Sequence, residues 1–214
     1  MIRRPNRSFG LAVAVALAIG ACTSAPGGAP PPVATPGPST AARPACPTAQ
    51  PPALPAGETR TVTIATDLGS MTLKIEADLS PIAAGNFVAL ASCGYYDGVV
   101  FHRVVPDFVI QGGDPTGSGS GGPGYTIADE PVTAQYGRGV VAMARTSQPN
   151  SVGSQFFIVL DDEARDALAS YNTYQIIGHV TAGMETADAI TAAAAGIELP
   201  SKPVAMTSVT VAQP

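Results

Sequence analysis

The sequence predicts a mainly β domain in which antiparallel strands form a closed sheet with helices at its ends. Beyond residue 60 there are about eight short apolar segments of strand length, and only two or three segments have the apolar spacing of a helix. These segments do not alternate regularly between strand and helix, as a parallel sheet with crossover helices would require. We expect strands at 61–65, 71–75, 99–104, 108–111, 139–144, 155–160, 175–180 and 204–211, and helices at 81–93, 161–169 and 184–193.

The first two strands and the first helix have the clearest local signals. Apolar residues alternate through 62–75 on both sides of a polar turn that contains Gly69, a pattern typical of a hairpin. Ser80 and Pro81 then supply an N-cap and a first-turn proline for a helix of about three turns that ends at Cys93.

The stretch from Gly112 to Gly124 is dense in glycine. Some glycine-rich loops cradle phosphates, but those end in Gly-Lys-Ser/Thr and lead directly into a helix, and this stretch does neither. We therefore expect a flexible surface loop.

The N-terminus has the pattern of a bacterial lipoprotein signal peptide. Arg residues precede an apolar run at 11–19, which is shorter than the roughly 20 residues of a membrane-spanning helix. Residues 19–22 resemble the lipobox, in which the cysteine becomes the lipid-carrying N-terminus. We expect cleavage of residues 1–21 and a lipid anchor, palmitate included, on Cys22, which would hold an extracytoplasmic protein on the bacterial cell membrane. Ordinary secretory cleavage near Ala21 is the alternative.

Residues 22–58 are rich in Pro and carry little charge. They contain too little bulky apolar surface to offset the entropy of ordering, so we expect a disordered tether and place the domain at 59–214. Cys46 and Cys93 are the remaining cysteines. In an oxidising compartment they are expected to form a disulfide that joins the end of the tether to the domain. Free thiols are the alternative, because the sequence does not give the distance between them.

Charge excludes one class of partner. Removal of residues 1–21 takes away three of the 11 basic residues against 16 acidic ones, so the net charge falls from −5 to near −8. Nucleic acids are bound through Lys and Arg placed against phosphates, and this chain has too few. We expect no nucleic-acid partner, and any membrane attachment must come from the lipid on Cys22.

Two common chemistries are also disfavoured. The chain has only two His residues, far apart in sequence, with no Cys or carboxylate at ligand spacing near either, so no metal site is expected. Ser154 lacks the Gly-x-Ser-x-Gly elbow of one large class of serine hydrolases.

The most informative stretch is 101–114, where polar residues interrupt two apolar segments. Alternation along an extended chain predicts that Arg103 shares a face with Phe101, and that Phe108 shares a face with Ile110, opposite Gln111. An Arg among apolar side chains requires partners for its guanidinium. Gln111 or a ligand carbonyl would supply them, and a structural pair with an acidic residue is the equal alternative.

Two motifs in this region carry a resemblance. Phe-His-Arg-Val-Val-Pro-x-Phe-x-x-Gln-Gly-Gly-Asp stands at 101–114, and Gly-Ser-Gln-Phe-Phe-Ile at 153–158. With matches at 86–87, 94–98 and 178–180, the chain closely resembles the cyclophilin family of peptidyl-prolyl cis-trans isomerases over residues 60–211. The resemblance implies an eight-stranded antiparallel closed barrel capped by two α-helices, with a shallow outer groove for an extended proline peptide. It implies no cofactor and no metal.

Carried over position by position, the resemblance implies that Arg103 is the catalytic arginine. The substrate-binding residues that it implies are His102, Phe108, Val109, Gln111, Ala144, Arg145, Gln155, Phe157, Leu168 and Tyr174. Val109 replaces the usual Met, and Arg145 the usual Asn. The family commonly has Trp-Leu and then His in the region of 161–174, whereas this chain has no Trp and has Ala167-Leu168 and Tyr174 there. Because that Trp contributes to cyclosporin binding in the family, we expect weak sensitivity to the drug.

The expected function is therefore isomerisation of X-Pro bonds in exported or cell-envelope proteins, by a monomer that binds proline-containing segments of unfolded proteins. Two alternatives stay open, a catalytically weak proline-peptide binding module and a surface scaffold. The intact Arg103 favours the enzyme, and the altered Trp and His positions leave room for the binding module.

Overall fold

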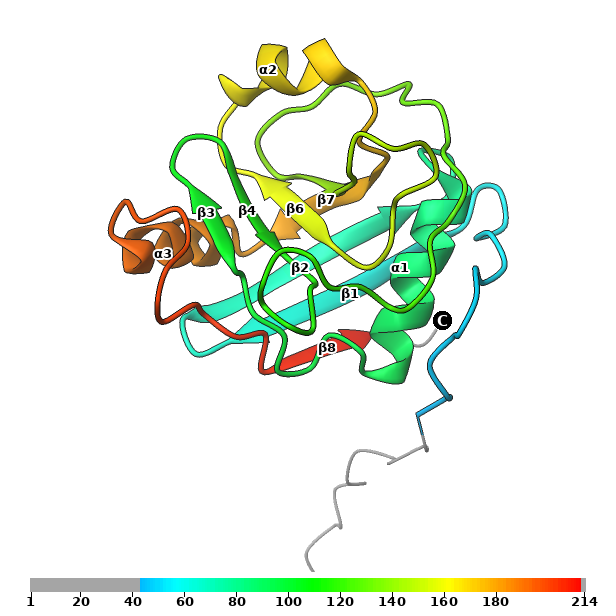
Figure 1. Cartoon of the computed structure of the whole chain (residues 1–214), viewed down its shortest axis with the longest axis horizontal. Helices are drawn as coiled ribbons and strands as arrows, with labels where there is room; N and C mark the ends of the chain where they lie inside the picture. Colours follow the sequence, from blue (N-terminus) through cyan, green and yellow to red (C-terminus); the bar gives the residue numbers. More distant parts are fainter. Residues whose placement is uncertain (1–42, 213–214) are drawn as a thin grey trace, which may run out of the picture. The chain divides into compact units, whose positions relative to one another are not determined.

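The computed structural model describes residues 43–212, which form eight strands and three helices (Figure 1). The strands are β1 (Thr59–Thr66), β2 (Gly69–Glu76), β3 (Arg103–Val105), β4 (Val109–Gly112), β5 (Val140–Met143), β6 (Phe156–Val159), β7 (Ile176–Ala182) and β8 (Ser208–Val211). The helices are α1 (Pro81–Cys93), α2 (Ala164–Tyr171) and α3 (Met184–Ala194). All strand pairs are antiparallel and belong to one sheet, in the order β3-β4-β6-β5-β7-β2-β1-β8. The predicted mainly β class is confirmed.

The sheet curls round and closes through the segments that precede its two edge strands, β3 and β8. Val100 forms a bridge with Ala205. Around it, the amide of Phe101 donates to the carbonyl of Val204 at 2.9 Å, and the amide of Met206 donates to Val99 at 2.9 Å. Closure is thus by a short bridged contact and not by a full strand ladder. For the same reason the predicted strand at 99–104 is interrupted, and β3 itself begins only at Arg103.

The interior of the curled sheet holds one large apolar cluster, to which every strand contributes. It includes a group of aromatic rings in which Phe87 and Tyr96 both meet Phe156 edge to face, with centroids 5.2 and 5.6 Å apart. Helices α1 and α3 lie on opposite sides of the sheet in Figure 1. Both contribute buried residues to the cluster, which agrees with the two capping helices that the family resemblance implies.

A second, smaller apolar cluster lies on the outer face of the sheet. Val109, Ala142, Phe157 and Val159 belong to it, whereas their strand neighbours Ile110, Val141, Phe156 and Ile158 point into the interior, because alternate residues of a strand face opposite sides. The third helix, α2, covers this outer cluster with Ala164 and Leu168. The helix predicted at 161–169 is therefore present, shifted to 164–171.

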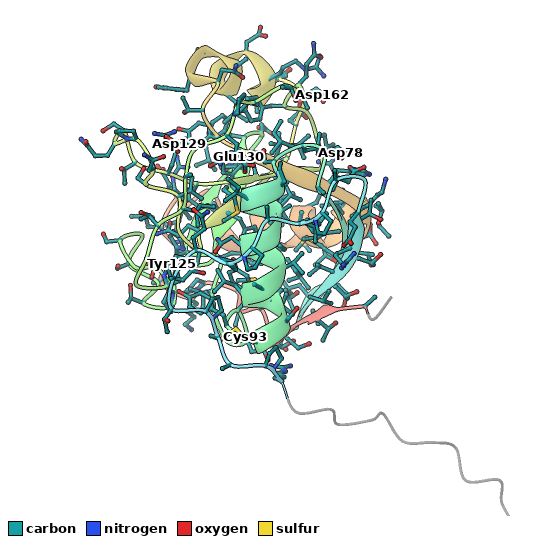
Figure 2. All side chains as sticks on the ribbon, turned by 90° about the vertical axis from the view of Figure 1, so that its right-hand side faces the viewer. Asp78, Cys93, Tyr125, Asp129, Glu130 and Asp162 are labelled. Carbon is teal, nitrogen blue, oxygen red and sulfur yellow. A yellow bond between two sulfur atoms is a disulfide. The ribbon has the colours of Figure 1, made fainter. Side chains whose placement is uncertain are left out.

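The start of α1 is capped by a residue from a distant loop. Ser80 occupies the N-cap position, as predicted, but its side chain makes no capping hydrogen bond. Instead the carboxylate of Glu130 accepts from the amides of Ile82 and Ala83, at 2.8 and 2.9 Å. An acidic group here satisfies free amides and complements the helix dipole. Figure 2 shows Glu130 at this end of α1 and Cys93 at the other.

The segment 46–58, predicted as part of the disordered tether, is fixed to the domain. A disulfide joins Cys46 to Cys93 at the end of α1. Leu54 is buried in the interior cluster, and its amide donates to the carbonyl of Pro81 at 2.9 Å. Gly85 of α1 leaves room for this crossing, since a side chain there would lie 2.4 Å from the Pro52 carbonyl. Figure 2 shows the segment passing over α1. The predicted boundary at 59 is thus too late, because backbone hydrogen bonds and one disulfide order a segment whose composition lacks apolar bulk.

The predicted signal peptide at 1–21, the lipidation site Cys22 and the first part of the tether lie outside the described residues. Within 43–212, none of the helices combines the length and the apolar composition needed to span a bilayer.

Candidate functional site

A row of paired residues, three of them predicted site residues, crosses the outer face of four neighbouring strands. Arg103 in β3 lies directly opposite Gln111 in β4, Gln111 lies opposite Phe157 in β6, and Phe157 lies opposite Ala142 in β5. Directly paired residues in an antiparallel sheet project from the same face. The register therefore brings the guanidinium, the amide and the aromatic ring of the predicted site onto one surface.

The apolar part of the site is the outer cluster beside this row. Phe157 is buried at its centre, with Val109 and Leu168 as buried neighbours. Phe108, Ala144 and Tyr174 are partly buried and pack against it. The ring of Tyr174 meets Phe157 edge to face at a centroid distance of 5.4 Å. The structure thus brings residues from the divergent segment 161–174 to the same aromatic ring as the motif residues.

The predicted alternation was wrong at two positions. Phe108 packs with Val109 in the outer cluster, whereas Ile110 faces the interior. Phe101 is in the interior, whereas Arg103 is half exposed on the outside. Both errors have one cause: the residues at 101 and 108 lie just outside the strands β3 and β4, so the regular two-residue alternation does not extend to them.

Two glutamines form the polar side of the site. The Gln111 side-chain amide donates to the Gln155 side-chain oxygen at 2.9 Å. Gln155 in turn donates to the carbonyls of Gly119 and Gly121, at 3.0 and 2.9 Å. A cavity of about 590 Å³ lies beside them, lined by Gln111, the glycine loop from Gly119 to Thr126, Ala144 to Thr146, Ser151 and Gly153 to Gln155.

Asp114 holds the glycine loop in place. Its side chain is fully buried and accepts hydrogen bonds from the amides of Thr116, Gly119 and Gly121, at 2.7, 2.6 and 3.0 Å. Burial alone would raise the pKa of Asp114, but these hydrogen bonds outweigh burial and hold the pKa well below its usual range. The stretch predicted as a flexible loop is therefore anchored at its centre by a carboxylate.

His102 is 6% exposed and lies beneath Gly119 of the same loop. Burial lowers its pKa from the usual value, so the ring is neutral at pH 7. The structure thus places the His102 ring against the glycine loop that lines the cavity, and its contact with substrate stays a prediction.

The Arg145 side chain is held by the loop that follows it and by Asp129. Its guanidinium turns away into the loop that follows it, where it donates to the carbonyls of Thr146 and Gln148 and pairs with Asp129 at 3.0 Å. The neighbouring Ala144 amide donates to the Gln155 carbonyl at 2.9 Å. The side chain at 145 therefore supports the loop, while Arg145 also lines the cavity.

Arg103 is 32% exposed, and its Nε donates to Oε1 of Glu198 at 2.7 Å. Within residues 43–212, Nη1 and Nη2 have no hydrogen-bond partner. The pair with an acidic residue, left open by the sequence, is therefore present, but it engages only one side of the guanidinium. Glu198 was missed by the sequence reasoning because it lies 95 residues away and belongs to no motif.

Within 43–212, no three His, Cys, Asp or Glu side chains lie close enough together to hold a metal ion. The chemistry that the site can perform is that of a cationic donor beside an apolar pocket, with fixed amide groups on the far side.

Comparisons with known proteins identify one family. The family described as "Cyclophilin type peptidyl-prolyl cis-trans isomerase/CLD" matches residues 61–211. The chain is 47% identical over 108 residues to a peptidyl-prolyl cis-trans isomerase-like 1 of Rhizopus delemar, a match that covers 48% of this chain and 65% of that protein. It is 42% identical over 136 residues to peptidyl-prolyl cis-trans isomerase CYP18-2 of Arabidopsis thaliana, a match that covers 61% of this chain and 80% of that protein. Among the curated relatives, the matched region spans as little as 21% of the relative's own length.

Solved structures agree with the sequence comparisons. A cyclophilin type peptidyl-prolyl cis-trans isomerase of Cryptosporidium parvum superposes with a TM-score of 0.65 at 30% identity, and the match covers 73% of this chain and 99% of that one. A second structure of the same protein, in the presence of the dipeptide Ala-Pro, gives a TM-score of 0.63 at 31% identity. This match covers 72% of this chain and 99% of that one.

Proposed function

The chain belongs to the cyclophilin family of peptidyl-prolyl cis-trans isomerases, and from this premise we propose that it accelerates isomerisation of X-Pro bonds in exported or cell-envelope proteins. Residues 61–211 are the isomerase domain. The observation that carries the proposal is the register that sets Arg103 beside Gln111 and Phe157 on one face. The Ala-Pro dipeptide named with the Cryptosporidium protein supports a proline-containing ligand.

The reaction defines what the site must do. Rotation about a peptide C–N bond breaks amide resonance against a barrier of about 18–20 kcal/mol, and X-Pro bonds populate both isomers. In the twisted state the nitrogen is pyramidal and regains its lone pair. A donor aimed at that nitrogen or at the prolyl carbonyl stabilises the twisted state more than either planar isomer. Among residues 43–212, Nη1 and Nη2 of Arg103 have no partner and can act as such donors.

The apolar cluster provides the second requirement. Phe108, Val109 and Phe157 belong to the outer cluster, on the face of the sheet that also carries Arg103, and offer an apolar surface for the prolyl ring. Low water content around the ring disfavours the planar amide, which is the more dipolar form. The fixed amides near Ala144 and Gln155 hold the residues that flank the proline. Catalysis is then differential binding of the twisted state, without a nucleophile or proton transfer.

The cellular setting is part of the proposal. The pattern of residues 1–22 supports export and a lipid on Cys22, and uncatalysed prolyl isomerisation takes tens to hundreds of seconds, which would delay the folding of exported proteins. The full chain with Cys22→Ser should move from the membrane fraction to the soluble fraction when expressed in a bacterium. Retention of this variant in the membrane would contradict the lipid anchor.

A binding module without useful turnover is the second candidate. It is favoured by the ion pair that already occupies Nε of Arg103 and by the absence of Trp from the chain. NMR line shapes of an Ala-Pro peptide separate the two functions. An isomerase broadens and merges the cis and trans signals at catalytic protein concentrations. A binding module shifts the peptide signals only near stoichiometric concentration and leaves the exchange rate unchanged.

A further inference from the structure

The loop after α3 turns back sharply toward β3. Ala195 and Gly196 both have left-handed backbone conformations, with φ of 52° and 78°, and the amide of Ile197 donates to the carbonyl of Ala194 at 2.9 Å. A left-handed Ala is uncommon and is tolerated where the surrounding structure requires the turn. These two residues redirect the chain from the helix so that the next residues run beside the edge strand of the sheet.

Glu198 is attached to β3 at two points. Its carbonyl accepts from the amide of Val104 at 2.8 Å, and its carboxylate accepts from Nε of Arg103 at 2.7 Å. The hydrogen bond from Val104 uses a backbone amide on the free edge of β3, where no neighbouring strand supplies an acceptor. Consecutive residues of β3 thus hold the main chain and the side chain of one glutamate, which fixes Glu198 relative to the strand.

The residues on either side show that burial does not hold this loop. Ile197 and Leu199 are both exposed, so the loop gains little from apolar packing at these positions. Glu198 itself is 57% exposed, and exposed ion pairs contribute little to stability. The contacts that define the position of Glu198 are those with β3, and one of the two is to Arg103.

We propose that Glu198 is a positioning residue for Arg103 in the isomerase reaction, an inference that rests on the proposed function. The carboxylate fixes the guanidinium through Nε and leaves Nη1 and Nη2 free for the prolyl peptide. A guanidinium is planar, so a hydrogen bond at Nε restricts the direction of the other two nitrogens. Preorganised donors stabilise a transition state without reorganising during the reaction.

The decisive experiment compares kcat and KM of the full chain and its variants with an Ala-Pro peptide. Glu198→Ala should lower kcat/KM by about threefold to tenfold, mainly through kcat, because the loss concerns orientation in the transition state. Glu198→Gln keeps an oxygen that accepts from Nε and should restore at least half of the activity. Asp188→Ala is the matched control. Asp188 lies on α3 and forms an exposed ion pair with Arg138, and the N–O distance of this pair, 2.7 Å, equals that between Arg103 and Glu198. The control should retain wild-type kcat/KM.

Two further readouts separate positioning from a structural role. In a double-mutant cycle, Glu198→Ala should have no effect in an Arg103→Ala background. The Nε–Hε NMR signal of Arg103 should be protected from solvent exchange in the wild type and lose that protection in Glu198→Ala. Equal or higher kcat/KM in Glu198→Ala would overturn the role of Glu198, while leaving the isomerase assignment intact. An inactive wild-type domain would instead overturn the proposed function, and the Nε–Hε signal would still report on the pair.

Discussion

Arg103 and Gln111 are direct antiparallel partners, so the guanidinium and the amide leave the sheet on the same face, one strand apart. Gln111 is tied to Gln155, and Gln155 to the glycine loop. On the other side, Arg103 is tied to Glu198. Two hydrogen-bonded networks therefore fix neighbouring polar groups of the surface proposed to bind the prolyl peptide, one through Arg103 and the other through Gln111.

Phe157 should be needed for both folding and peptide binding. It is buried in the outer cluster and contacts Tyr174 edge to face. Phe157→Ala removes the ring and leaves a cavity, which should lower the free energy of unfolding by about 3–5 kcal/mol. Urea denaturation measures this loss, and KM for an Ala-Pro peptide should rise in the fraction that remains folded. A variant with wild-type stability and wild-type KM would show that the outer cluster is not the proline pocket.

Asp114 should make the domain sensitive to acid. Its pKa is lowered in the folded state, so its contribution to stability is fully present above the unfolded pKa of about 3.9 and is lost as the pH falls below that value. The melting temperature of the wild type should therefore fall more steeply between about pH 4 and pH 2 than that of Asp114→Asn. At pH 7 the variant should be less stable by about 1–3 kcal/mol, because one amide group cannot replace every acceptor site of the carboxylate. Parallel pH profiles of the two proteins would refute this role of Asp114.

The disulfide between Cys46 and Cys93 should stabilise the domain by restricting the unfolded chain. It closes a loop with a sequence separation of 47, for which a contribution of about 2–4 kcal/mol is typical. Unfolding in urea with and without a reductant measures the contribution. The double variant Cys46→Ser/Cys93→Ser is the control, and its stability should not respond to the reductant. A wild type whose stability is equally insensitive would contradict the pairing.

Cyclosporin should inhibit the domain weakly, because the chain has no Trp. Ala167 stands nearest to the position of the family's Trp and is exposed on α2, next to the buried Leu168. A larger side chain is therefore accommodated there, and Ala167→Trp should bind the drug more tightly than the wild type does. Titration calorimetry of both proteins tests this. Nanomolar binding by the wild type would show that another residue replaces the missing Trp.

Much of the fold followed from local pattern. The hairpin β1–β2 and helix α1 have strong alternation and helical spacing, and the motif strands β4 and β6 lie close to where the sequence predicted them. Errors arose where short strands meet turns. Phe101 and Phe108 sit one or two residues outside a strand, and there the alternation rule no longer fixes which face a side chain takes.

The remaining features depend on contacts between distant parts of the chain. Glu130 caps α1 from 48 residues away, and Glu198 reaches Arg103 from 95 residues away. Neither glutamate belongs to a local motif, so single-sequence reasoning had no signal for them. The segment 46–58 shows the same limit, because its composition predicts disorder while its order depends on α1.

The central claim is that Arg103 stabilises the twisted prolyl bond, and the kcat/KM of Arg103→Ala on an Ala-Pro peptide tests it most directly. The side chain is half exposed and makes one ion pair, so the fold should survive its removal with an unchanged circular dichroism spectrum. We predict a fall in kcat/KM of at least about tenfold, with Arg138→Ala, which removes a cation that pairs with Asp188 and not with Glu198, as the control. Wild-type kcat/KM in a folded Arg103→Ala domain would contradict the account.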